Sequence, residues 1–411
     1  MIRVRWPVAA ALSAALTLGA AGGAAVGAAG SAPAAHSAVA SVGPRLVTTT
    51  IPDPQDYVPA KWLPYPGQPR ADVLLPAGYD PAERYPLVLN LGGLGGDYAK
   101  AALGTSVHIN AIVVTPEPYN GWYDDWWNNG KRRDPAWESY FLDDVVPWIL
   151  HHYRIRPQRR WHAVIGISMG GLGATYLGGR LPGFFGTVAS LSGFLDPQYF
   201  GAITQEGMGI VSAAPLRDDH ASYPVLGPPD GFYATGHNPT RLVQNLQHTH
   251  VFLTTGTGVP SKAGIDQNLV LALGGGGLEG PIIYPMNVLF RQAAQRAGVA
   301  VTYVPHPGGH DGPDFSKELA AAIAWGLFKP VVDHPRTWTN QTVATSGHLW
   351  NISYRFDRPP TAVVRFTAAY GRLTISHAGS AVTVETSGGC RIHTATPATL
   401  DLASRDCLVV R

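Results

Sequence analysis

Short apolar runs alternate with stretches of helical periodicity along most of this 411-residue chain. Three runs bounded by Pro or Gly, at 85–91, 111–115 and 161–166, are mainly apolar, which is typical of strands buried on both faces of a parallel sheet. Further strands are predicted at 70–76, 188–194, 249–254 and 299–304, and helices at 138–153, 171–181, 287–298 and 315–328. The alternation predicts an α/β fold, in which helices cover both faces of a mostly parallel sheet. Two segments rich in Gly, 201–236 and 262–280, interrupt it without a predicted element.

The pattern changes near residue 333. Residues 362–366, 372–376 and 381–385 alternate apolar and polar positions, with Gly, Ser and Asn turns between them and no helical periodicity. The segment 333–411 is therefore predicted to be a small antiparallel β domain. The two cysteines of the chain, Cys390 and Cys407, both lie in it and are predicted to form a disulfide, as is usual in exported proteins.

Residues 1–40 have the composition of an export signal followed by a small-residue linker. Arg3 and Arg5 form a short basic start, and residues 6–30 are almost wholly Ala, Gly, Leu and Val. A retained membrane anchor is the alternative, because the run is long enough to span a bilayer but is dominated by weakly apolar residues. We expect a secreted or cell-envelope protein whose α/β domain occupies 41–332.

The charge of the chain excludes some partners. Thirty Lys and Arg against 28 Asp and Glu give a net charge of +2, which provides no field for binding nucleic acid. The 48 Gly and 35 Pro, together with 11 Trp and 17 Tyr, indicate a folded protein rich in loops rather than a disordered one. The composition gives no sign of a cofactor or a metal site.

The strongest chemical signal is the pentapeptide Gly166-Ile-Ser-Met-Gly170, between a predicted strand and a predicted helix. In this context G-x-S-x-G forms a sharp turn that projects the Ser168 hydroxyl above the sheet and turns the Met169 N–H into the site. A serine hydroxyl needs a base to act as a nucleophile. The motif therefore predicts a serine nucleophile and a histidine further along the chain.

The candidate base is His310, in the Gly- and Pro-rich segment between the last predicted strand and helix of the α/β domain. His306 is the alternative, since it lies nearer the end of that strand. The acid that orients the histidine should follow the strand at 249–254. Asp266 and Glu279 are the only acids in 256–280, and distance from the strand favours Asp266.

A second backbone donor for an oxyanion hole should come from the loop after the strand at 87–91. The sequence Gly92-Gly-Leu-Gly-Gly96 fits this requirement, because glycines let the main chain approach a reacting carbonyl. A phosphate-binding loop is the other reading of these glycines, but the Lys-Ser/Thr ending of a P-loop is missing.

These motifs occur together, in one order, in the esterase D and mycolyltransferase (antigen 85) branch of the α/β-hydrolases, which the chain resembles over residues 70–328. The resemblance implies an α/β-hydrolase fold with Ser168 as nucleophile, His310 as base, Glu279 as acid, and the Leu94 and Met169 amides as oxyanion donors. It rests on Leu75-Pro-Ala-Gly-Tyr79 with Tyr85-Pro-Leu-Val88, Trp122-Tyr-Asp-Asp-Trp126, Trp137-Glu138, Gly166-Ile-Ser-Met-Gly-Gly171, Phe185-Gly-Thr-Val-Ala-Ser-Leu-Ser-Gly193 and Gly308-Gly-His310.

The resemblance also implies an activity: transfer or hydrolysis of acyl esters, such as the mycolyl esters of cell-envelope glycolipids. Members that use trehalose carry an Asp and an Arg where this chain has Gly92 and Gly95, which speaks against trehalose as acceptor. Cleft candidates are Gly93 and the aromatic residues Trp122, Trp126 and Trp137, for which packing in the core is the alternative. A simple secreted carboxylesterase, or a non-catalytic binding or adhesion protein of the same fold, is the alternative function. The β domain is expected to contact the cell wall.

Overall fold

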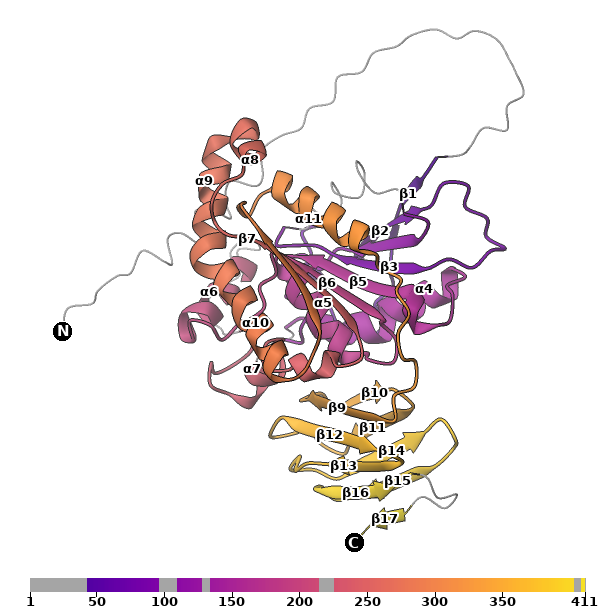
Figure 1. The fold of residues 1–411 in the computed structure, drawn as a ribbon. Coiled ribbons are helices and arrows are strands. Elements are labelled where there is room, and N and C mark those ends of the chain that lie inside the picture. The colour runs from indigo at the N-terminus through magenta and orange to yellow at the C-terminus, as the bar shows by residue number, and fades with distance from the viewer. Residues whose placement is uncertain (1–42, 96–108, 128–133, 214–224, 403–407, 411) are drawn as a thin grey trace, which may run out of the picture.

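The computed structural model describes residues 43–95, 109–127, 134–213, 225–402 and 408–410. The predicted export signal at 1–40 and Cys407 lie outside these ranges, so the signal and the disulfide remain predictions. Within the described ranges no helix has both the length and the apolar character needed to cross a bilayer. Figure 1 shows the α/β part above and the antiparallel strands of the C-terminal segment below.

An eight-stranded sheet forms the centre of the α/β part, in the order β1-β2-β4-β3-β5-β6-β7-β8. The ladders from β4 through β8 are all parallel, whereas β2 runs antiparallel to both of its neighbours. The predicted α/β-hydrolase fold is confirmed. The strands are β1 (Arg45–Thr50), β2 (Arg70–Leu75), β3 (Leu87–Leu91), β4 (Ile112–Pro116), β5 (His162–Ile167), β6 (Thr187–Leu191), β7 (His250–Gly256) and β8 (Val301–His306).

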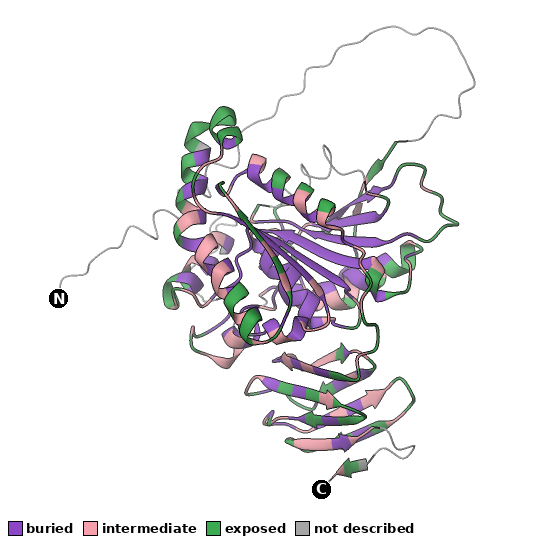
Figure 2. Cartoon of the chain, viewed as in Figure 1, coloured by how far each residue is buried: buried purple, intermediate pink, exposed green. Residues whose placement is uncertain are grey.

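Helices cover both faces of this sheet, and its central strands are buried throughout, as Figure 2 shows. On one face α11 (Gly312–Trp325) packs Phe315 and Leu319 on the strands. On the other lie α4 (Val146–His152), α5 (Met169–Arg180) and α10 (Tyr284–Arg296). The helix predicted at 138–153 is continuous but contains a π-helical turn, η2 (Phe141–Val145), between α3 (Trp137–Tyr140) and α4. Short 3-10 turns are η1 (Ala60–Trp62), η3 (Arg159–Trp161) and η5 (Val243–Leu246).

The two Gly-rich segments contain helices that the sequence pattern did not predict. The first holds α6 (Ala202–Ala213) and α7 (Phe232–Gly236). The second holds α8 (Lys262–Gln267), α9 (Leu269–Leu278) and the π-helical turn η6 (Glu279–Ile283). Both segments follow strands at the carboxyl edge of the sheet, where α/β folds bind their ligands.

The C-terminal strands form two antiparallel sheets that share one core. The predicted strands are confirmed as β12, β13 and β14, in which buried residues alternate with exposed or half-buried ones. One sheet has the order β10-β11-β14-β15 and the other β17-β16-β13-β12-β9. The strands are β9 (Thr337–Thr342), β10 (Ser346–Leu349), β11 (Ile352–Phe356), β12 (Val364–Ala369), β13 (Arg372–Ile375), β14 (Val382–Thr386), β15 (Arg391–Thr394), β16 (Ala398–Asp401) and β17 (Leu408–Val410).

Strand β9 joins the two parts by side chains that hydrogen-bond to main chain. The Asn340 amide donates to the Gly179 carbonyl at 2.9 Å, near the end of α5. Asn245 accepts from the Gln341 N–H at 2.7 Å and donates to its carbonyl at 2.9 Å. The antiparallel sheets therefore lie at the end of α5 remote from Ser168. The division of the chain at residue 333 remains a prediction.

Candidate active site

Ser168 lies in the turn between β5 and α5, with φ 56° and ψ −117°. Non-glycine residues rarely adopt a positive φ, and such strain is maintained only where the surrounding structure enforces it. The Ser168 N–H donates to the Leu191 carbonyl of β6 at 3.0 Å, and its own carbonyl accepts from Gly171 and Phe194. These bonds fix the turn and leave the side chain at the carboxyl edge of the sheet.

Glycine is required on both sides of Ser168 because other backbone lies against it. A Cβ at Gly166 would overlap the carbonyl of Gly170, and a Cβ at Gly170 would overlap the carbonyl of Leu91 in β3. The two glycines thus let α5 start directly above the sheet.

The His310 imidazole connects Ser168 to Glu279. Its Nε2 lies 2.8 Å from Ser168 Oγ, and its Nδ1 lies 2.6 Å from Glu279 Oε2. With the proton on Nδ1, the ring donates to the carboxylate and accepts from the hydroxyl, which is the arrangement needed for proton removal from serine. The His310 ring also lies edge-on to Phe315 of α11, with centroids 4.9 Å apart. Three residues far apart in sequence therefore form one continuous chain of hydrogen bonds.

Glu279 is fully buried and has a partner for each carboxylate oxygen. Oε2 accepts from His310, while Oε1 accepts from Thr255 Oγ1 at 2.6 Å and from Ser192 Oγ at 2.8 Å. A buried carboxylate that is this fully hydrogen-bonded is held in one orientation. Sequence reasoning named Glu279 as one of two candidate acids and preferred it to Asp266 only through the family resemblance, and it missed Ser192 and Thr255.

Asp266 lies elsewhere, on α8. Its carboxylate forms an ion pair with Lys262 at 2.6 Å, and its side chain is 59% exposed. A solvated i,i+4 pair of this kind is a common feature of helix surfaces. Between the two predicted acids, the geometry favours Glu279.

His306, the alternative candidate for the base, is paired with a different carboxylate. Its Nε2 lies 2.8 Å from Glu318 Oε1 on α11, and Glu318 is buried. Ser192 Oγ also lies 2.8 Å from the same Glu318 oxygen. A second histidine–glutamate pair thus lies directly behind Glu279, and no sequence motif indicated it.

The loop after β3 approaches Ser168 closely. A Cβ added to Gly93 would lie 3.3 Å from Ser168 Cβ, and the Gly95 N–H donates to Asn120 Oδ1 at 2.9 Å, which holds the loop. Met169 begins α5, and amides in the first turn of a helix have no helical carbonyl to bind. The Leu94 and Met169 amides therefore remain the candidates for the oxyanion hole.

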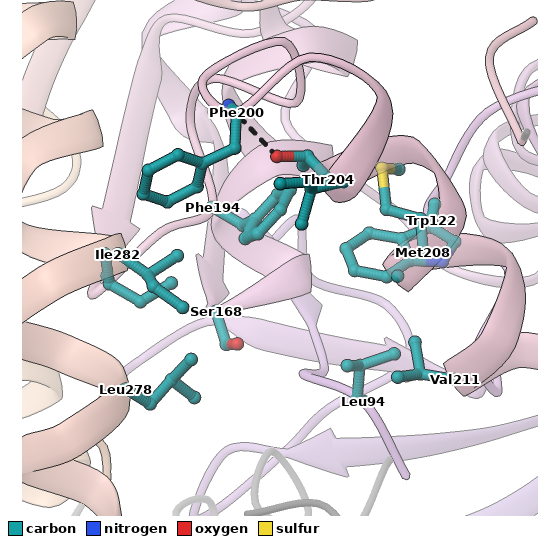
Figure 3. Close-up of a pocket in the computed structure, with 13 residues that line it drawn as sticks. Leu94, Trp122, Ser168, Phe194, Phe200, Thr204, Met208, Val211, Leu278 and Ile282 are labelled. Atoms are coloured by element: carbon teal, nitrogen blue, oxygen red, sulfur yellow. Dashed lines mark hydrogen bonds between the residues drawn. The ribbon is translucent and has the colours of Figure 1, made fainter. Parts of the chain in front are cut away.

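An apolar pocket opens beside Ser168 (Figure 3). Figure 3 shows the Ser168 hydroxyl between Leu94 on one side and Leu278 and Ile282 on the other. The wall opposite is formed by α6, where Thr204 Oγ1 accepts from the Phe200 N–H at 3.1 Å. The pocket fits an apolar chain better than a polar group. Its described lining is Leu94, Trp122, Ser168, Phe194, Phe200, Ile203, Thr204, Gly207, Met208, Val211, Leu278, Ile282 and Ile283.

The three tryptophans predicted for the cleft have different surroundings. Trp122 lines the pocket, lies 5.3 Å from the Phe194 ring and donates its indole N–H to Ser212 Oγ at 2.8 Å. Trp126 and Trp137 line a separate small cavity, and Trp137 is fully buried. Of the three, only Trp122 lines the pocket beside Ser168.

One buried cluster has residue types that could hold a metal ion. Ligand atoms of Asp124, Glu138 and His237 lie within 4.8 Å of one another. Glu138 Oε1 is 2.5 Å from Arg180 Nε, and Oε2 accepts from the Tyr176 hydroxyl at 2.7 Å. Burial alone would raise the pKa of Glu138, but Arg180 and His237 bring it to about 2. Because a divalent cation would compete with Arg180 for Glu138, we assign this cluster to packing beneath α5.

Comparison with known proteins shows the family. Residues 65–325, well over half of the chain, match the family model Esterase, described as "Putative esterase". The chain belongs to this esterase family.

Curated relatives in the family carry esterase and acyltransferase names. Esterase Rv1288 of Mycobacterium tuberculosis is 28% identical over 267 residues, which cover 59% of this chain and 52% of that protein. The diacylglycerol acyltransferase/mycolyltransferase Ag85C of Mycobacterium leprae is 26% identical, covering 55% of this chain and 67% of that protein. The chain therefore spans about half the length of the first of these relatives.

Among solved structures, MPT51 (FbpC1) of Mycobacterium tuberculosis has a TM-score of 0.47 and 17% identity, covering 69% of this chain and 99% of that one. An S-formylglutathione hydrolase from Agrobacterium tumefaciens has a TM-score of 0.47 and 16% identity, covering 70% of this chain and 96% of that one.

Proposed function

We propose that this esterase-family chain is a serine acyltransferase or carboxylic ester hydrolase that works through a covalent acyl-enzyme. The observation that carries the proposal is the hydrogen-bond chain from Ser168 through His310 to Glu279, at the mouth of an apolar pocket. The names of the relatives, which are esterases and mycolyltransferases, support the same class of reaction.

In the proposed mechanism His310 Nε2 takes the proton of Ser168 Oγ as the hydroxyl attacks the ester carbonyl. The developing oxyanion is held by the amides of Leu94 and Met169. His310 then returns the proton to the leaving alcohol. Water or a second alcohol then attacks the acyl-enzyme carbonyl. In this step His310 takes the proton of the attacking hydroxyl and returns it to Ser168 Oγ. Glu279, whose carboxylate oxygens are both hydrogen-bonded, holds the ring orientation and stabilises the imidazolium.

The proposed substrate is an ester with a long apolar acyl group, of the kind found in cell-envelope glycolipids, including mycolyl esters. The pocket supports this choice, because its described lining offers few polar side chains beyond Ser168 and Thr204. Export of the chain and contact of its C-terminal β domain with the cell wall belong to the same hypothesis, and they rest on sequence composition alone.

Labelling with a fluorophosphonate probe tests the proposal directly, because such probes react only with an activated serine. Wild type should label at one site, and Ser168→Ala should not label. Failure of wild type to label, or equal labelling of the variant, would favour the non-catalytic binding or adhesion function. Adding an alcohol acceptor to a p-nitrophenyl ester assay, and measuring acylated alcohol against free acid, separates transferase from hydrolase.

A further inference from the structure

Two carboxylates share a single hydroxyl behind His310. Ser192 Oγ lies 2.8 Å from Oε1 of Glu279 and 2.8 Å from Oε1 of Glu318, and all three residues are buried. A hydroxyl has one proton and can donate to only one acceptor at a time. Two ionised carboxylates in this arrangement would repel each other with little water to screen them. One of the two carboxyl groups therefore needs a compensating proton nearby.

The His306 imidazole is positioned to hold that proton together with Glu318. Its Nδ1 lies 2.9 Å from the Pro307 carbonyl, which can only accept, so Nδ1 carries a hydrogen. Its Nε2 lies 2.8 Å from Glu318 Oε1. A further proton between these two atoms leaves the pair neutral, whether it is bound to nitrogen or to oxygen.

The surroundings of Glu318 favour retention of this proton. Its second oxygen, Oε2, is buried and has no hydrogen-bond donor among the described residues, so full ionisation would leave a charged oxygen unsolvated. Burial raises the pKa of Glu318 to about 7, with Glu279 acting in the same sense and His306 opposing it. Partial burial lowers the pKa of His306, but the hydrogen bonds to Glu318 and to the Pro307 carbonyl, together with the charge of Glu318, raise it overall.

We infer that His306 and Glu318 hold one proton between them and are neutral as a pair, so that no second net negative charge faces Glu279 across Ser192, and that both act as positioning residues for the proposed reaction. The inference rests on the proposed function for its catalytic consequence. When the pair loses its proton at alkaline pH, a second negative charge appears one hydroxyl away from Glu279. The added charge alters the electrostatic environment of Glu279 and, through the Glu279–His310 hydrogen bond, the protonation of the His310 imidazole.

Other charged groups near the pair do not replace this proton. Lys317 of α11 lies 3.5 Å from His306 Nδ1, on the exposed side of the ring, and lowers the pKa of His306. Asp314, also on α11, accepts from the Gly309 N–H at 2.8 Å and holds the segment that carries His310. Asp311 caps α11 through the Asp314 N–H at 3.2 Å.

The test is an NMR titration of the histidine rings in the full chain, with assignments from His306→Gln and His310→Gln. In wild type, His306 should titrate above its ordinary value of 6.5. His310 should then show a second step at the same pH. In Glu318→Gln, the His306 midpoint should fall by about one pH unit or more, and the second step of His310 should disappear. Glu385→Gln on β14, an exposed glutamate paired with Arg391, is the control and should change neither curve.

A His306 that titrates at its ordinary value in wild type overturns the inference, as does a His310 curve that is identical in wild type and Glu318→Gln. The wild-type curves decide the question even if Glu318→Gln fails to fold. The rate of fluorophosphonate labelling gives a second readout. The pH dependence of this labelling rate should show two ionisations in wild type and one in Glu318→Gln. At pH 7 the labelling rates of the two proteins should be within about fivefold of each other. If His306 and His310 share a titration step but wild type does not label, the proposed function is contradicted and the inference about the His306–Glu318 pair still holds.

Discussion

Glu279 Oε2 lies 2.6 Å from Nδ1 of His310, and the carboxylate that makes this contact is completely buried. Asp266, the other acid of the same segment, forms an exposed ion pair with Lys262. We therefore expect Glu279→Gln to lower kcat/KM for a p-nitrophenyl ester by about 10³–10⁴-fold, because the amide favours the wrong histidine tautomer. Asp266→Asn should remain within about twofold of wild type. The reverse ranking, with both variants folded by circular dichroism, would assign the acid to Asp266.

The acyl pocket can be tested with two isoleucines on the same helix. Ile203 and Ile210 of α6 are 47% and 41% exposed, but only Ile203 lines the pocket beside Ser168. Ile203→Trp should reduce kcat/KM for octanoyl esters relative to acetyl esters by about tenfold, because the indole occupies space that the longer chain needs. Ile210→Trp should leave the ratio unchanged. Equal effects of the two variants would place the acyl chain elsewhere.

Gly170 of the Ser168 turn and Gly274 of α9 differ in what surrounds them. A Cβ at Gly170 would overlap Leu91 main chain, whereas a Cβ at Gly274 meets nothing within 4 Å. Gly170→Ala should therefore destabilise the protein by about 1–3 kcal/mol or more and abolish labelling of Ser168. Gly274→Ala, in an exposed helix position, should stabilise it by about 0.5–1 kcal/mol. Thermal unfolding of both variants measures the contrast, and a stable, fully active Gly170→Ala would contradict the packing argument.

Asp124 is expected to make stability depend on pH. Both of its oxygens are buried without a hydrogen-bond partner among the described residues, and burial raises its pKa well above the ordinary value of 3.8. An acid whose pKa is raised by folding contributes stability that is fully present below 3.8 and is lost as pH rises towards the folded value. Because Asn does not titrate, Asp124→Asn should have a Tm about 2 °C or more above wild type at pH 8, with a smaller gain at pH 4.

The neighbouring Glu138 is the matched control for that experiment. Its pKa is lowered to about 2, so the stability that it contributes is present above the ordinary value of 4.5 and is lost only as pH falls towards 2. Glu138→Gln leaves Arg180 buried without its charged partner and should cost about 3–5 kcal/mol at neutral pH. If both substitutions lowered the Tm equally at pH 8, Asp124 would have to be ionised and paired in the native protein.

Local patterns in the sequence predicted seven of the eight strands of the large sheet, all but β1, and the position of Ser168. Runs such as 87–91 and 162–167 are strands because they are mainly apolar and bounded by turn residues, and these properties can be read from neighbours alone. The antiparallel strands β12, β13 and β14 were predicted from a second local pattern, because alternating apolar and polar residues indicate a strand with one buried face.

The helices of the two Gly-rich segments could not be predicted in this way. α9 has four consecutive glycines, and glycine disfavours an isolated helix. A Cβ at Gly275 would lie 2.9 Å from the His310 backbone nitrogen, so this helix depends on close packing against a loop 35 positions later. No local pattern contains that information.

Most of the site also depends on contacts distant in sequence. His310 could be proposed from its position after the last strand, but spacing alone pointed to Asp266 rather than Glu279. Ser192 and Thr255 both reach the buried Glu279 carboxylate, and Ser192 also reaches Glu318 on α11; only the folded chain brings these residues together. Trp126 shares a motif with Trp122, and Trp137 belongs to the following one, yet both line a different cavity from Trp122.

Helix α5 joins the two ends of the molecule. It starts beside Ser168, and Gly179 near its other end provides the carbonyl that Asn340 of β9 binds. At 1.5 Å per residue this is about 16 Å of rigid spacing between the nucleophile and the antiparallel sheets. A large partner or surface bound to the outer strands β15 to β17 would therefore leave the pocket unobstructed. The protein could be immobilised through its C-terminal sheets with Ser168 still open to substrate from the other side.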